Sequence, residues 1–98
     1  FRVPVKREGE VMKLLSLVNE QLLIGHFDIW EQESTIMFRQ TLLLSGGAEP
    51  TDAQVETLLA SAVEACERYY QAFQFVVWSN MDAKNAMECA HFETMGNA

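Results

Sequence analysis

Two histidines and two cysteines have the widest chemical repertoire in this chain, and they are His26, Cys66, Cys89 and His91. Cys89 and His91 are two positions apart in a predicted helix, so their side chains point about 200° away from each other around its axis. Cys66 and His26 are isolated, and no CxxC, HExxH or HxxxH spacing occurs. The sequence therefore predicts no metal site, and we expect no cofactor.

Cys66 is a poor candidate for a nucleophile, because it lies in the middle of a predicted helix between Ala65 and Glu67. No helix N-terminus lowers its pKa there, and acidic neighbours raise the pKa. A disulfide framework in so short a chain usually needs more than two cysteines. We expect Cys66 and Cys89 to be reduced thiols, packed as small apolar side chains in a cytoplasmic protein.

The carboxylates and the glycine pair are typical of surface and loop positions rather than of a catalytic site. Glu31 and Glu33 fall in a predicted hairpin turn, and Glu64 with Arg68 has the spacing of a surface ion pair on a helix. The glycine pair 46–47 follows a predicted strand, but it lacks the GxGxxG or P-loop pattern that binds phosphate. We therefore expect that the protein is not an enzyme.

Arg39 is a charged residue inside an otherwise apolar predicted strand. The favoured interpretation is a solvent-facing or edge position. The alternative is a crevice between sheet and helices that unites Arg39 with His26 or Asp28. Such a crevice would favour a small-ligand sensor or an enzyme, whereas the favoured interpretation makes a small-molecule partner unexpected.

Aromatic side chains are in excess over what a core built from so few elements can enclose. The second long helix is apolar nearly all round in its C-terminal part, so it must be covered on more than one side. We expect a protein contact, in the first instance a homodimer, and the alternative is burial within the chain. The candidate contact residues are Trp30, Tyr69, Tyr70, Phe73, Phe75 and Trp78.

Composition and charge restrict the class of protein. The chain has 98 residues, of which 49% are hydrophobic, which predicts one globular domain over 1–98. Its net charge of −7 disfavours nucleic acid and anionic membrane as partners. No apolar run approaches the ~18 to 20 residues of a membrane span. Because the chain starts at Phe1 rather than Met, we expect it to be the C-terminal part of a longer natural chain.

The stretch from Gly25 to Leu44 predicts an antiparallel hairpin, because two β-rich runs flank a short polar link. Strand side chains alternate, so Phe27 and Ile29 share one face of the first run. In the second run Ile36, Phe38, Leu42 and Leu44 share a face. Residues 1–3 are expected to be the end of a further strand, which Pro4 terminates.

Helical spacing accounts for most of the remaining chain. It predicts a first helix over Val5 to Ile24, with Gly25 as its left-handed cap. It also predicts a long helix that begins at a capping box formed by Thr51 and Gln54 and ends at Trp78. A strand over 72–78 is the alternative for the end of that helix. A last helix runs from an N-cap at Asp82 to Gly96. We expect an α+β fold in two layers, with helices packed on one face of a mostly antiparallel sheet.

Several stretches resemble the YbjN-like family, also described as bacterial sensory transduction regulators. They are Gly25–Phe27, Met37–Arg39 leading to Leu42–Leu44, Cys66–Tyr70 and Ala72–Trp78. The resemblance implies a fold like that of type III secretion chaperones, upstream strands, frequent dimerisation and protein binding without catalysis. The sequence differs from the family at Gln71, where many relatives have proline, and at residues 79–80, where they have glycine. The resemblance carries no catalytic motif, so it transfers no functional residue.

Overall fold

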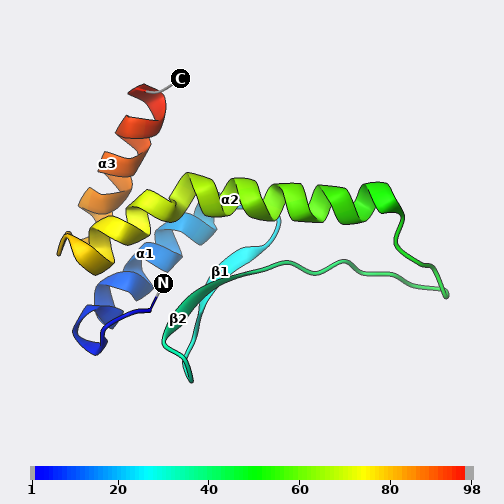
Figure 1. Cartoon of the computed structure of the whole chain (residues 1–98), viewed down its shortest axis with the longest axis horizontal. Coiled ribbons are helices and arrows are strands. Elements are labelled where there is room, and N and C mark those ends of the chain that lie inside the picture. Colours follow the sequence, from blue (N-terminus) through cyan, green and yellow to red (C-terminus); the bar gives the residue numbers. More distant parts are fainter. Residues whose placement is uncertain (1, 97–98) are drawn as a thin grey trace.

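The computed structural model describes the backbone of residues 2–96 and the side chains of residues 2–91. A short 3-10 helix, η1 (Val5–Arg7), leads into α1 (Glu8–Gln21). The strands β1 (His26–Trp30) and β2 (Thr35–Arg39) follow, and then α2 (Asp52–Trp78) and α3 (Ala83–Gly96). Figure 1 shows α2 as a long rod that lies across α1 at one end and extends well past it at the other. The predicted α+β class is confirmed.

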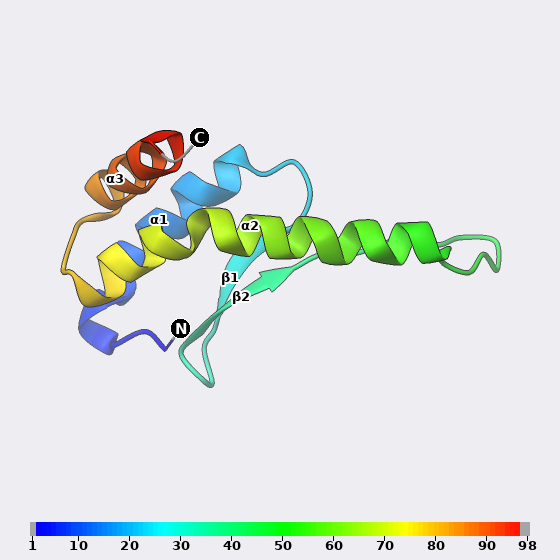
Figure 2. The same cartoon turned by 45° about the horizontal axis from the view of Figure 1, so that its top comes forward.

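The hairpin presents an apolar face to the helices. β1 and β2 pair antiparallel, so that Phe27 is opposite Phe38 and Ile29 is opposite Ile36. These four side chains belong to the core or pack against it. The opposite face carries His26 and Arg39, which are exposed. The alternation predicted from the sequence is therefore correct over the paired part of the hairpin, and both views show α1 and α2 along the same side of it (Figure 2).

The second strand is shorter than predicted, because β2 ends at Arg39 and not at Leu44. Arg39 pairs with His26, which is the first residue of β1, so the chain beyond it has no partner strand. Within the described chain, residues 40–50 form neither helix nor strand, and Leu43 is 89% exposed. The predicted strand at residues 1–3 is a single antiparallel bridge from Arg2 to Thr35, and Phe1 lies outside the described residues.

The first helix is also shorter than predicted. α1 ends at Gln21, and Leu22 is already extended, whereas the apolar spacing predicts helix to Ile24. The Asn19 side chain accepts a hydrogen bond from the backbone N–H of Phe27 (2.8 Å) and donates one to its carbonyl (2.9 Å). These bonds draw the chain back along the last turn of α1. Gly25 has a left-handed φ of 76°, but it turns the chain into β1 and does not cap the helix.

The long helix continues to Trp78, so the alternative strand over 72–78 is wrong. Its helical phase buries Tyr69, Phe73 and Val76 on one face, which a strand over this run would split between two faces. The predicted capping box at Thr51 and Gln54 is present, with hydrogen bonds in both directions.

The turn after α2 contains an asparagine with a positive φ. Asn80 has a φ of 58°, in the left-handed region, at one of the two positions where the resemblance places glycine. Asparagine tolerates this conformation better than most residues. The chain therefore makes the turn from α2 towards α3 through an asparagine in the left-handed region.

Two side chains near the start of α1 hold the α2–α3 junction. The Arg7 guanidinium donates to the carbonyl oxygen of Val76 (2.8 Å) in the last turn of α2 and to that of Met81 in the link to α3. Glu10 accepts a hydrogen bond from the backbone N–H of Ala83 (3.0 Å), the first residue of α3. Asp82 accepts from the N–H of Asn85, as the predicted N-cap does. Ala83, Ala86 and Ala90 are buried, so α3 packs on the other helices through a face of small residues.

Two glycines provide a matched pair for testing the fold. A Cβ on Gly25 would lie 2.6 Å from the Phe38 ring and 2.9 Å from the Arg39 carbonyl oxygen, at a φ that disfavours any side chain. We expect Gly25→Ala to lower the free energy of unfolding by about 1 to 3 kcal/mol. A Cβ on Gly9, in the first turn of α1, would meet no described atom within 4 Å. Gly9→Ala should therefore raise stability by up to about 1 kcal/mol in urea unfolding.

The bond between Glu10 and α3 predicts a pH effect. The hydrogen bond from Ala83, and then the one from Lys13, hold the pKa of the Glu10 carboxyl below its ordinary value of 4.5. The ionised carboxylate therefore stabilises the fold above that value, and this contribution is lost as the pH falls through the lowered pKa. In unfolding measured from pH 7 to pH 3, the deficit of Glu10→Gln should be largest near neutrality and shrink in acid. Glu20→Gln, at an exposed position of α1, is the control; an equal deficit at every pH would contradict the assignment.

Candidate protein-contact surface

The six predicted contact residues divide into buried and exposed groups. Tyr69 and Phe73 are 4% and 2% exposed, so these two rings follow the alternative, which is burial within the chain. Both rings pack on Phe27, with centroids at 6.0 Å and 5.3 Å. Two of the six aromatic candidates are therefore packed with Phe27 in a three-ring contact inside the chain.

The other candidates remain available to a partner to different degrees. Phe75 is half-buried and packs against the core. Trp30 at the end of β1, and Tyr70 and Trp78 on α2, are exposed, and Trp78 has the largest exposed fraction at 63%. These three residues stay candidates for a protein contact.

A larger apolar surface lies on the N-terminal half of the long helix. The N-terminal half of α2, residues 52–64, extends beyond the packed elements, and we call it the arm (Figure 1). On it Leu59 is 63% exposed and Val63 is 55% exposed, and Val55 is exposed as well. Leu43 and Leu44, in the segment that leads to the arm, are exposed too. The helical spacing of Val55 and Leu59 marks a helix face, but spacing alone does not say how far along the helix that face is covered.

The accessible surface of the whole chain is large for a protein of its mass. The accessible area is 7026 Å², whereas a compact monomer of this mass has about 5,700 Å². The radius of gyration is 15.2 Å, against about 13 Å for a compact domain. The excess of about 1,300 Å² exceeds the ~800 Å² that one partner buries in a standard interface. The chain is therefore more extended than a compact monomer of its mass, and the arm is part of this extension.

The crevice at Arg39 is not supported by the structure. His26 and Arg39 are opposite each other in the hairpin and both are exposed, on the face turned away from the core. The Arg39 Nε lies 3.2 Å from the Met37 sulfur of the same strand. Asp28 accepts a hydrogen bond from the adjacent backbone N–H of Ile29. This is the solvent-facing position that the sequence analysis favoured.

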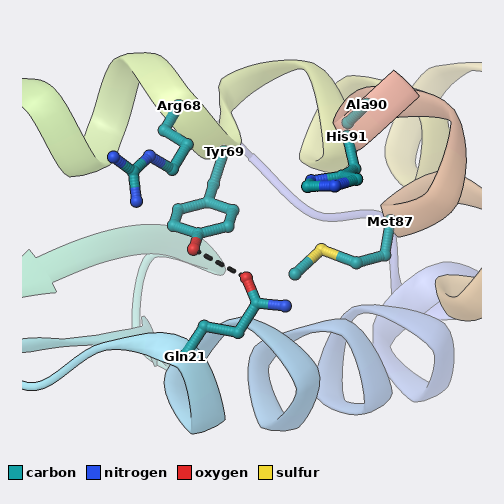
Figure 3. Close-up of a pocket in the computed structure, with 6 residues that line it drawn as sticks. All are labelled: Gln21, Arg68, Tyr69, Met87, Ala90 and His91. Atoms are coloured by element: carbon teal, nitrogen blue, oxygen red, sulfur yellow. Dashed lines mark hydrogen bonds between the residues drawn. The ribbon is translucent and has the colours of Figure 1, made fainter. Parts of the chain in front are cut away.

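A cavity of about 260 Å³ opens between the three helices. Figure 3 shows Tyr69 and Gln21 facing each other across it, with the Tyr69 hydroxyl donating to the Gln21 side-chain oxygen (2.9 Å). Met87 and Ala90 contribute apolar walls, and His91 lies at the α3 side. The hydroxyl that could act in acid–base chemistry is thus already bonded to a neutral amide, and the cavity is smaller than the ~300 to 1,000 Å³ typical of ligand pockets.

The chemistry available elsewhere is also limited. Both cysteines are free, and partial burial raises the pKa of the Cys66 thiol, so it is poorly suited to nucleophilic attack at neutral pH. Among the residues that the structure describes, no group of three His, Cys, Asp or Glu side chains could hold a metal ion. In the same part of the chain no polar or charged side chain is fully buried.

Comparisons with known proteins give one match. The sequence model of the YbjN family, described as "Putative bacterial sensory transduction regulator", matches residues 1–75. No curated protein and no solved structure matches the chain. Within the described residues, no helix combines the length and apolarity that a membrane crossing requires.

Two aromatic substitutions separate the core from the exposed surface. Phe73→Ala removes a ring that is fully enclosed, so we expect a loss of about 3 to 5 kcal/mol in the free energy of unfolding. Trp30→Ala removes a similar ring from an exposed position and should cost about 1 kcal/mol or less. Chemical unfolding of both variants measures the difference, and equal losses would contradict the division into buried and exposed candidates.

Proposed function

Because the chain belongs to the YbjN family, we propose that it is a regulatory protein-interaction module that acts as a homodimer and without catalysis. The observation that carries the proposal is the apolar surface of the arm, together with the excess of about 1,300 Å² over a compact monomer. Exposed apolar patches of this kind mark interaction sites in soluble proteins.

The kind of partner follows from the surface. The exposed side chains of the arm are aliphatic, and the protein as a whole is acidic, with a net charge of −7. Such a surface attracts apolar stretches of polypeptide and repels the phosphates of nucleic acids and anionic lipids. A chaperone-like role, in which the module holds another polypeptide, also requires an exposed apolar surface. Two free thiols support a cytoplasmic location, where cysteines are kept reduced.

The proposed assembly predicts a mass that depends on concentration. In sedimentation equilibrium, the wild-type chain of 11.1 kDa should approach twice this mass as its concentration rises through the micromolar range. Glu20→Gln, at an exposed position of α1 outside the candidate contact residues, should leave this behaviour unchanged. A mass of one chain at every concentration up to about 1 mM would refute the homodimer. It would mean that the free energy of dimerisation is weaker than about −4 kcal/mol.

A further inference from the structure

The exposed side of α2 carries a second apolar stripe beside the one that packs in the core. It is formed by Leu59, Val63, Cys66 and Tyr70, at successive spacings of four, three and four residues, and all four are exposed. At 100° for each residue these side chains fall within about 60° around the helix. Alternating steps of three and four are the spacing at which two helices pack along a common seam.

On this stripe Leu59, Val63 and Tyr70 are 63%, 55% and 50% exposed within the chain. Ser61, which accepts a hydrogen bond from Gln40 (2.8 Å), lies about 170° around the helix from the centre of the stripe. The segment after β2 thus contacts α2 on the opposite side. The same spacing continues to Phe73 and Val77, but both are buried in the core.

The order of the side chains fits an identical helix that runs in the opposite direction. Spacings of four, three and four read the same from either end, which a contact across a two-fold axis requires. We propose that a second copy of this chain covers the stripe, with the two α2 helices antiparallel. Leu59 of each copy then lies opposite Tyr70 of the other, and Val63 lies opposite Cys66. This inference rests on the proposed function and specifies its partner and geometry.

Charge and size favour a second copy over a partner of opposite charge. The stripe itself has no charged residue, although the chain carries −7, so two copies can meet without burying a carboxylate. Glu56 and Glu67 lie at its border, and the ion pair of Glu64 with Arg68 is further round the helix. The stripe is about 18 Å long, which makes this a small seam and a dimer that dissociates at micromolar concentration.

A lysine on the stripe tests whether the seam is the interface. Val63→Lys adds a charge at the middle of the seam in both copies, and Val63 is exposed and outside the core, so the fold should persist. We expect the dissociation constant of the dimer to rise about tenfold or more in sedimentation equilibrium. Thr57→Lys, on the same arm but about 150° around the helix from the stripe, should leave it within about twofold. Circular dichroism of both variants verifies that α2 is intact.

A disulfide tests the antiparallel register. In a Cys89→Ser background, Val63→Cys places a thiol opposite Cys66 of the second copy, within the distance that a disulfide spans. Because partial burial raises the pKa of the Cys66 thiol, the oxidation is performed with diamide at pH 8.5. We expect at least about fivefold more covalent dimer than for the Cys89→Ser parent. Thr57→Cys in the same background is the matched control and should show no gain.

Three results would overturn the inference, and they are distinct from failure of the proposed function. Val63→Lys could dimerise as tightly as the wild-type chain, or Val63→Cys could give no more cross-link than Thr57→Cys. The parent could also cross-link as fully as Val63→Cys, which indicates parallel helices with Cys66 facing Cys66. In each case a wild-type dimer would still support the proposed function, whereas a wild-type monomer at all concentrations would remove both.

Discussion

The attachment of Phe27 is the constraint on which the rest of the structure depends. Its ring contacts Phe38 in the neighbouring strand and Tyr69 and Phe73 in α2, while its backbone N–H and C=O are bonded to the side chain of Asn19 in α1. A two-stranded hairpin is at best marginally stable in water. One residue therefore ties the hairpin to both helices, and it fixes which face of the sheet is covered.

Other elements of the fold cover only the C-terminal half of α2, and this follows from the contacts of Phe27. β1 and α1 are short, and they meet α2 only from about Ala65 onward, where its buried residues begin. α3 adds cover to the same half, because its alanines allow close approach to the other helices. The arm remains outside, although it belongs to the same continuous helix. The length of the partner elements, and not the sequence of α2, decides where its buried part begins.

The sequence predicts the faces of the elements better than their ends. Alternation in the hairpin, the apolar stripe of α1 and the capping box at Thr51 and Gln54 are local patterns, and the structure has all three. The end of β2 at Arg39 could not be predicted, because it is set by the first residue of the partner strand. For the same reason Leu59 and Phe73 cannot be told apart by spacing, although one is exposed and the other buried. Asn19 gave no signal either, since an asparagine near a helix end is usually a surface residue.

The arm stays helical without tertiary cover because its helix begins and ends in defined contacts. The capping box satisfies the first backbone N–H groups, Glu64 and Arg68 form an ion pair one turn apart, and the packed half of α2 removes the cost of nucleation. A surface that is already ordered loses little conformational entropy when a partner binds. The same rigidity keeps its aliphatic side chains in water while the chain is alone. In the proposed homodimer the arm is therefore a preformed binding surface, and its exposed apolar residues are side chains that the single chain leaves in water.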